Sequence, residues 1–163
     1  RVGCQAGTYI RTLCHHMGQQ LSGAHMAELR RTRVAHLNEE SLVTLQDLAD
    51  AFWYYQHEKK EKFIRHCIHP IESAIVHLPK VWAFDSALDA LCHGRDLALP
   101  GITKVETPIN KGETVAVLSL KDELVCLGNA LMPSEEMLKK EKGMAVDADK
   151  VFMQPGTYRG GGK

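Results

Sequence analysis

The spacing of apolar residues changes at Leu78–Pro79, near the middle of this 163-residue chain. Before this point apolar side chains recur at helical spacing, and after it short β-branched runs alternate with tight turns. A chain with both patterns cannot fold as one helical bundle or as one uninterrupted sheet. The sequence therefore predicts an α+β fold, with one domain over residues 1–78, a second over residues 79–155 and a flexible tail at 156–163.

Helices dominate the expected first domain. A helix is expected to begin near Thr8, and Thr44 followed by Asp47 is the capping pattern of a second helix. The alternating residues of His25–Ala35 predict a strand. We interpret the aromatic run Trp53–Tyr55 as core packing rather than as a base-stacking platform, because aromatic residues at helical spacing usually belong to a core.

The expected second domain is mainly β. Its predicted strands are Val81–Phe84, Ile102–Glu106, Glu113–Leu120, Glu123–Ala130 and Lys150–Met153. Two helices are expected beside them, at Ser86–His93 and at Ser134–Lys142, the second capped by Ser134. Short strands joined by tight turns and accompanied by two helices predict a small barrel.

A glycine, a tyrosine and an arginine come together in Cys4–Leu13, at the predicted start of the first helix. Gly7 supplies a turn, and Tyr9 and Arg11 flank the apolar stripe that begins at Ile10. Backbone amides at the start of a helix favour anions, so a phosphate or a carboxylate suits this place. The alternative is that Arg11 makes a solvated salt bridge and Tyr9 borders a core.

The net charge is zero, but the first 36 residues carry five arginines and a single acid, Glu28. Arg30, Arg31 and Arg33 stand close together in this part of the chain. Arginine suits bidentate phosphate contacts, so the segment predicts contact with a nucleic acid. A solvated strand face is the alternative.

Two groups of motifs resemble a known enzyme family. The runs Cys4–Leu13 and Gly23–Arg33 are similar to the late active-site motif of the dyskerin and tRNA pseudouridine synthase B family of RNA pseudouridine synthases. The runs Trp82–Ala87, Leu99–Ile102 and Gly128–Met132 resemble the PUA domain of its archaeal and eukaryotic members. The resemblance implies the end of a pseudouridine synthase catalytic domain followed by a small, mainly-β PUA barrel.

The family's chemistry assigns expected roles to particular residues. In the family an aspartate attacks a flipped uridine, whose base detaches, rotates and reattaches through carbon. The resemblance implies that Arg11 orients this carboxylate, that Tyr9 shares the pocket and that Leu29 lies against the target base. The motif that carries the aspartate, G-T-L-D-P, does not occur in this sequence, so the chain is expected to be inactive alone. RNA contacts are expected at Arg30, Arg31, Arg33, Gly94, Arg95, Pro100 and Gly101.

The implied function is isomerisation of uridine to pseudouridine in rRNA or tRNA. The implied partners are an H/ACA guide RNA, the target RNA and the small protein subunits of the H/ACA ribonucleoprotein. A non-catalytic RNA-binding module, or an accessory chain of a ribonucleoprotein, is the alternative. No cofactor is implied. No metal is predicted either, because a structural zinc site usually includes a C-x-x-C pair, which is missing around His15, His16, His66, Cys67 and His69.

No apolar run reaches the length needed to span a membrane, so no membrane partner is expected. The five cysteines are odd in number and widely separated, which indicates reduced thiols without a disulfide. A cytoplasmic protein is expected if the source is archaeal and a nucleolar one if it is eukaryotic, and no targeting signal is visible.

Overall fold

The computed structural model describes residues 1–158, with helices and short strands in the first half and a sheet domain in the second. The first half contains α1 (Ile10–Gln20), β1 (Arg33–Val34), β2 (Leu37–Asn38), η1 (Glu39–Ser41), α2 (Leu45–Glu58), α3 (Glu61–Cys67) and η2 (Ile71–Ile75), where η marks a 3-10 helix. The second contains β3 (Lys80–Ala83), α4 (Asp85–Cys92), β4 (Leu97–Ala98), η3 (Leu99–Gly101), β5 (Ile102–Val105), β6 (Thr114–Leu118), β7 (Leu124–Ala130), α5 (Ser134–Met137) and β8 (Met144–Val151). The predicted α+β fold is confirmed.

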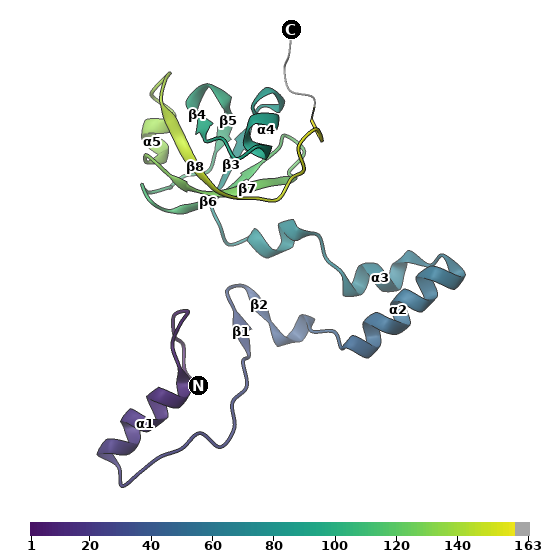
Figure 1. Cartoon of the computed structure of the whole chain (residues 1–163), viewed down its shortest axis with the longest axis vertical. Coiled ribbons are helices and arrows are strands. Elements are labelled where there is room, and N and C mark those ends of the chain that lie inside the picture. Colours follow the sequence, from purple (N-terminus) through teal and green to yellow (C-terminus); the bar gives the residue numbers. More distant parts are fainter. Residues whose placement is uncertain (159–163) are drawn as a thin grey trace.

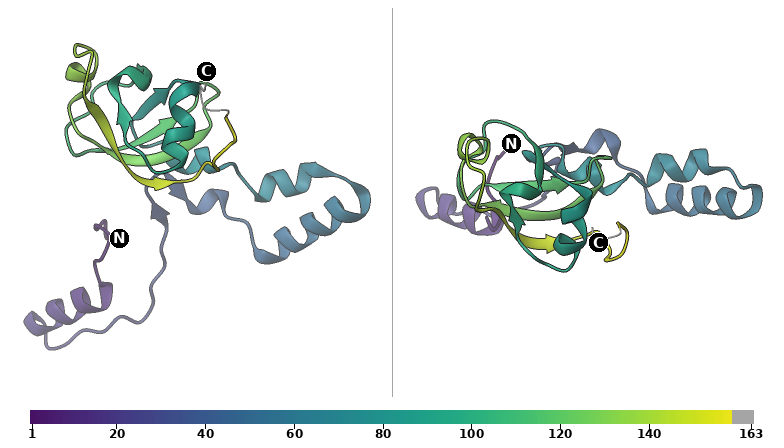
Figure 2. Two further views of the ribbon diagram at one scale, coloured as in Figure 1. Left: turned by 45° about the horizontal axis from the view of Figure 1, so that its top comes forward. Right: turned by 90° about the horizontal axis from the view of Figure 1, so that it is seen from above.

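The sheet domain lies at one end of the molecule, and the elements that precede it extend away from it as two arms (Figure 1). The α2–α3 pair projects to one side, and α1 with the extended segment after it forms the other arm (Figure 2). Within residues 1–78 the buried positions are Gly18, Ala51 and Ile75. Most of the packing in the structure therefore belongs to the second half of the chain.

Six strands form one nearly closed sheet in the order β4-β8-β7-β6-β3-β5. β3 runs parallel to β6, and the other neighbouring strands are antiparallel. β6, β7 and β8 form its long ladder, in which Gly128 lies opposite Val115 on one side and Ala148 on the other. β-branched residues fit such a pleated, half-buried surface, and Val115 and Val117 of β6 are completely buried.

The main core lies between this sheet and α4, whose Leu88 and Leu91 are fully enclosed. Cys92 of α4 and Cys126 of β7 belong to the same core, and burial raises the pKa of the Cys126 thiol to about 12. A thiol with so high a pKa stays protonated and unreactive at neutral pH. The sheet also carries a second, smaller cluster, made of Ile75, Trp82, Ala116, Leu118 and Leu124. Through Ile75 the η2 segment, which precedes the sheet domain in sequence, packs on it.

Local sequence signals located the start of α2 correctly. Thr44 Oγ1 accepts a hydrogen bond from the Asp47 backbone N–H at 3.1 Å, and Asp47 Oδ2 accepts one from the Thr44 N–H at 2.9 Å. These bonds form the predicted capping box, and those from Thr44 hold the pKa of Asp47 below its usual value. The bounds of β3, β5, β6, β7 and α4 also lie close to the predicted ones.

The prediction of a strand over His25–Ala35 is wrong. Only Arg33–Val34 pairs with another segment of residues 1–158, namely with β2 in a short hairpin. The residues before it run as an extended chain between α1 and β1 (Figure 1). Alternation of side chains indicates an extended backbone, but a strand also needs a hydrogen-bonded neighbour, which this segment lacks within the described structure.

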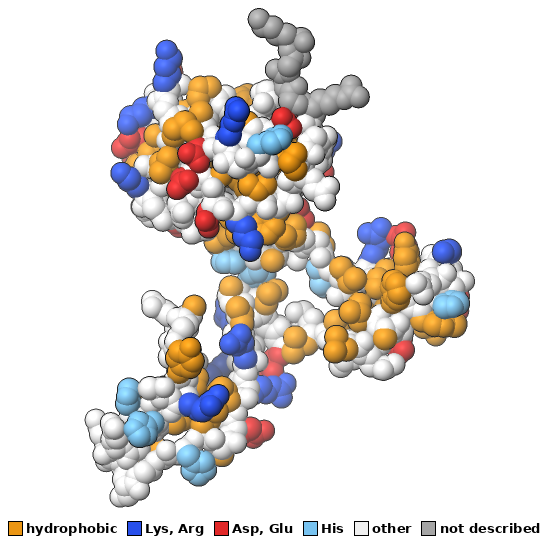
Figure 3. Space-filling view, in the orientation of Figure 1, with side chains coloured by type: hydrophobic (Ala, Val, Ile, Leu, Met, Phe, Trp, Pro, Cys, Tyr) orange, Lys and Arg blue, Asp and Glu red, His pale blue; other side chains and the backbone are white. Residues whose placement is uncertain are grey.

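The interpretation of Trp53–Tyr55 as core residues is also wrong for the described structure. Trp53 is 50% exposed, and Phe52, Tyr54 and Tyr55 are exposed as well. Tyr54 meets Phe63 of α3 with ring centroids 5.1 Å apart, so the two helices contact mainly each other. Hydrophobic side chains remain on the outside of this arm, where Figure 3 shows them gathered over α2 and α3.

Four expectations near the C-terminus need correction. The last strand begins at Met144, well before the predicted Lys150, and α5 ends at Met137. Ser134 does not cap α5, because its Oγ accepts the Ile109 N–H at 3.1 Å instead. The tail predicted at 156–163 is held at its start, since the Tyr158 hydroxyl donates to Glu123 and Gly156 N–H donates to Asp89. Residues 159–163 lie outside the described part.

Candidate nucleic-acid interface

The glycine, tyrosine and arginine of the N-terminal motif stand at the start of α1. Gly7 takes a left-handed conformation with φ of +82°, where a side chain is unfavourable, and it ends the loop just before the helix. Tyr9 is the N-cap residue and is 78% exposed, and its side chain makes no capping bond. Arg11 lies exposed in the first turn, which contains no acidic residue. Both side chains are therefore open to a ligand at the helix end that favours negative charge.

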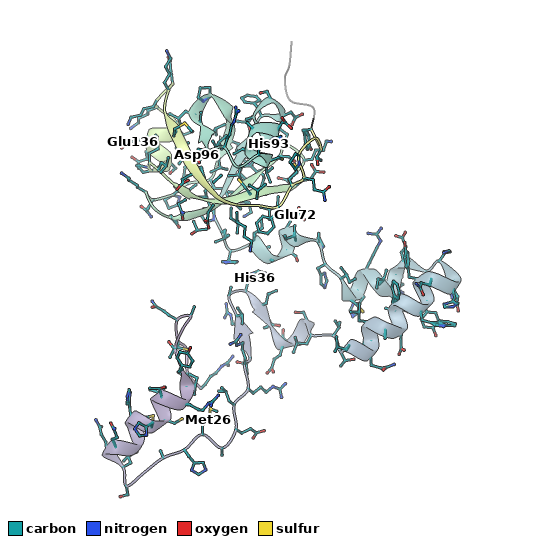
Figure 4. The ribbon with its side chains drawn as sticks, in the orientation of Figure 1. Met26, His36, Glu72, His93, Asp96 and Glu136 are labelled. Carbon is teal, nitrogen blue, oxygen red and sulfur yellow. The ribbon has the colours of Figure 1, made fainter. Side chains whose placement is uncertain are left out.

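The segment that follows α1 packs closely against Gly18, a buried glycine near the end of this helix. A Cβ on Gly18 would collide with the backbone of Ala24, and the Gly23 N–H donates to the Gly18 carbonyl at 2.9 Å. The chain therefore reverses tightly after α1, and the segment that carries Met26 returns beside the helix (Figure 4). Leu29 follows on this segment and is 59% exposed. Its side chain therefore faces solvent and is accessible to a ligand.

The three clustered arginines differ in what they contact. Arg30 pairs with Glu39, with Nε at 2.7 Å and Nη2 at 2.6 Å from Oε2. Arg33 Nε donates to the carbonyl of Ala35 at 2.7 Å, which holds the side chain against its own hairpin. Arg31 makes neither type of contact within residues 1–158. Of the three guanidinium groups, that of Arg31 is the freest to bind a phosphate.

A polar hollow of about 420 Å³ adjoins these arginines. It is lined by Arg1, Thr32, Arg33, His36, Asn38, Glu39 and Glu40. The hollow brings Arg1, at the start of the chain, close to Thr32 and Arg33 at the start of the hairpin. No sequence pattern indicated that Glu39 and Glu40 border this surface, because ion pairing across a hairpin depends on its tertiary geometry. Two carboxylates there oppose a dense array of phosphates.

The second group of predicted residues flanks β4 at the end of α4. Gly94 has φ of +77° and its N–H donates to Leu91, while the Arg95 N–H donates to Ala90. These bonds end α4 with a left-handed glycine and leave the Arg95 side chain exposed. The neighbouring Asp96 accepts the Ala148 N–H at 3.1 Å, which fixes this turn to β8.

Pro100 is exposed, whereas Gly101 has a packing role. A Cβ on Gly101 would lie 3.0 Å from Leu97 Cδ1 and 3.1 Å from the Ala87 side chain. The Gly101 carbonyl accepts the Phe84 N–H at 2.8 Å, so the glycine holds η3 tightly against the start of α4. Gly94, Arg95 and Pro100 form the accessible part of this group, on a different part of the molecule from the N-terminal motif (Figure 1).

Two further features bear on the possible ligands. In the described part of the chain no three histidine, cysteine or acidic side chains are grouped so that they could hold a metal ion. Across the same residues, no helix has the length and apolar character needed to cross a membrane.

Comparison with protein families divides the chain into two matched regions. Residues 11–76 match the tRNA pseudouridylate synthase B C-terminal domain, and residues 79–152 match the PUA domain. A probable tRNA pseudouridine synthase B of Thermococcus onnurineus is 58% identical over 97% of this chain and 48% of its own length. A protein of the same description from Pyrococcus furiosus is 54% identical over 97% of this chain and 47% of its own length. The chain thus spans about half the length of these relatives.

Solved structures agree with the sequence relatives. The chain is similar to one in the crystal structure of the archaeal box H/ACA sRNP Nop10–Cbf5 complex, with a TM-score of 0.86 and 52% identity over 94% of this chain and 50% of that one. It is also similar to one in the structure of an H/ACA RNP bound to a substrate RNA containing 2'-deoxyuridine, with a TM-score of 0.83 and 53% identity over 94% of this chain and 49% of that one. By these matches the chain belongs to the tRNA pseudouridine synthase B family, as its C-terminal domain followed by a PUA domain.

Proposed function

We propose that the chain is the C-terminal part of an RNA pseudouridine synthase that works with an H/ACA guide RNA. Residues 1–78 complete the catalytic domain, and residues 79–155 are the PUA domain that anchors the guide. The target is a uridine in rRNA or tRNA, and the small protein subunits of the ribonucleoprotein are partners. In an archaeal cell the place of action is the cytoplasm. The observation that carries this proposal is the fold match across both parts of the chain to a relative solved with substrate RNA.

Arg11 has a specific place in the proposed reaction. A carboxylate nucleophile close to a polyanion must remain ionised, and an adjacent guanidinium favours its charged form and fixes its direction. Arg11 is exposed at the end of α1 that attracts anions, and Tyr9, the N-cap residue of the same helix, is close to it. Leu29 and Arg31 on the neighbouring segment then contact the flipped base and the RNA backbone.

A second candidate function is that of a non-catalytic RNA-binding module. The PUA domain match favours it, and the G-T-L-D-P motif that carries the family's nucleophile does not occur in residues 1–163. The chain by itself, incubated with guide and target RNA, is therefore expected to form no pseudouridine. The same chain joined to an upstream half that carries the motif is expected to be active. Pseudouridine formed by the isolated chain, measured by mass spectrometry of the RNA, would contradict the assignment of the nucleophile to another segment.

The exposed turn at the end of α4 is expected to read the 3′ end of the guide. Discrimination is the ratio of the affinities for a hairpin with a 3′ ACA and for one with that trinucleotide scrambled. Arg95→Ala in the whole chain should lower this ratio by about tenfold, because one bidentate base contact contributes about 1–3 kcal/mol. Affinities measured by fluorescence anisotropy test this. Arg65→Ala is the matched control, since Arg65 lies exposed on α3 and, within residues 1–158, pairs with Glu61 of the same helix. Equal discrimination by wild type and Arg95→Ala would remove the turn from the RNA-reading surface.

A further inference from the structure

The short helix η2 is held from two sides by residues distant in sequence. On one side His36, at the tip of the β1–β2 hairpin, contacts Ser73 of the helix, and on the other side Leu124 of the sheet domain contacts Glu72 of the helix. Figure 4 shows His36 and Glu72 on either side of this helix, between the N-terminal arm and the barrel. We call His36, Glu72, Ser73, His77 and Leu124 the η2 joint.

The contact on the hairpin side has defined hydrogen-bond roles. His36 Nε2 lies 2.7 Å from the carbonyl oxygen of Ser73, which only accepts, so Nε2 carries the proton. In neutral His36 the other nitrogen, Nδ1, is then an acceptor. It lies 3.2 Å from Nδ1 of His77, which is the donor of this second bond. His36 therefore joins the hairpin tip to both ends of the segment from Ser73 to His77.

The contact on the barrel side combines a charged hydrogen bond with apolar packing. Glu72 Oε1 accepts the backbone N–H of Leu124, the first residue of β7, at 2.9 Å. Ile75, one turn further along η2, is 6% exposed and packs with Trp82 and Leu118 of the sheet domain. A carboxylate bond to a backbone amide is directional, and the buried isoleucine prevents rotation about it. η2 is thereby fixed in both position and orientation on the sheet domain.

We infer that His36 and Glu72 are positioning residues that set the separation between the N-terminal motif and the RNA-reading turn at Gly94–Arg95. This inference rests on the proposed function. His36 lies two residues beyond β1, next to the arginine segment, and Glu72 reaches the domain that carries the turn. An RNA duplex between two protein-bound ends is stiff, so the enzyme presents the uridine correctly only if its two binding sites stay at one distance. A loosened joint allows several distances.

The test uses the full-length enzyme, consisting of this chain and its upstream catalytic half, and guide RNAs whose stem next to the 3′ trinucleotide is native or one base pair longer or shorter. Single-turnover rates give the ratio of activity on native and altered guides. The double variant His36→Ala/Glu72→Ala is expected to lower this ratio by about tenfold, because misplacement by about 1 Å costs up to about a hundredfold in rate. The variant Glu72→Gln keeps an acceptor for Leu124 and should retain the wild-type ratio. Glu61→Ala, on the α2–α3 arm, is the control.

A second measurement is independent of catalysis. Spin labels are attached at Ser41→Cys, beyond the hairpin, and at Lys111→Cys, in the sheet domain, after the exposed native thiols have been replaced by serine. Pulsed electron paramagnetic resonance then measures the distribution of distances between the two labels. The distribution should be narrow with the native joint and broad in the double alanine variant. The inference is overturned if the double alanine variant still binds the ACA hairpin and either its distance distribution or its ratio of activity on native and altered guides equals that of the wild type. If the wild-type enzyme modifies RNA with none of the guides, the proposed function itself is contradicted. The role inferred for the η2 joint is then contradicted as well.

Discussion

Arg11→Ala in the full-length enzyme is expected to reduce single-turnover pseudouridine formation by about a hundredfold to a thousandfold, the usual loss when one charge-stabilising donor is removed from an active site. The Arg11 side chain is exposed at the first turn of α1 and contributes nothing to either core cluster. The substitution should therefore leave folding and most of the RNA affinity intact. The loss should appear in the chemical step and not in binding.

Two matched variants sharpen this test. Arg11→Lys keeps the charge but replaces the planar fork by a point charge, so it should recover only part of the rate. Arg31→Ala removes the freest guanidinium of the neighbouring segment and should weaken RNA binding with a smaller effect on the rate of bound RNA. The prediction fails if Arg11→Ala reacts within a few-fold of wild type at saturating enzyme.

Gly128→Ala is expected to destabilise the PUA domain by about 3 kcal/mol, at the upper end of the usual cost of overpacking. A Cβ at this position would overlap the carbonyl oxygen of Asp147 and lie 2.6 Å from Val146 Cγ1. Both obstacles belong to β8, and one of them is backbone, so relief requires β7 and β8 to separate. A change of this size lowers the melting temperature of a small domain by roughly 10 °C or more.

Thermal unfolding followed by circular dichroism measures this effect, with Asn129→Ala as the control on the same strand. Asn129 is half-buried, and its replacement by alanine introduces no new atoms. Separation of β8 would also free the Ala148 N–H that Asp96 accepts, so binding of the ACA hairpin should weaken near the melting temperature. Equal melting temperatures for the two variants would show that β7 and β8 accommodate the added methyl group without a loss of stability.

The sequence alone was sufficient where the physical signal is local. Thr44 and Asp47 cap α2 through bonds between residues three apart, and short apolar runs bounded by tight turns located β6 and β7. The glycine and arginine that end α4 were also readable, because a left-handed glycine after an apolar helical stripe is a local terminator. The family resemblance rested on motifs of the same short range and is confirmed by the comparisons.

Only the tertiary structure decided features that depend on a distant neighbour. Whether His25–Ala35 becomes a strand depends on a pairing partner, and whether Trp53 is buried depends on what packs against α2, which no periodicity encodes. The ion pair of Arg30 with Glu39, the bond of Glu72 to Leu124 and the contact of His36 with Ser73 likewise join side chains to groups that the sequence does not mark as neighbours. The sequence therefore determined most of the helices and strands and the motifs on which the family resemblance rests. The positions of these elements relative to one another follow from hydrogen bonds and apolar contacts that exist only once the chain has folded.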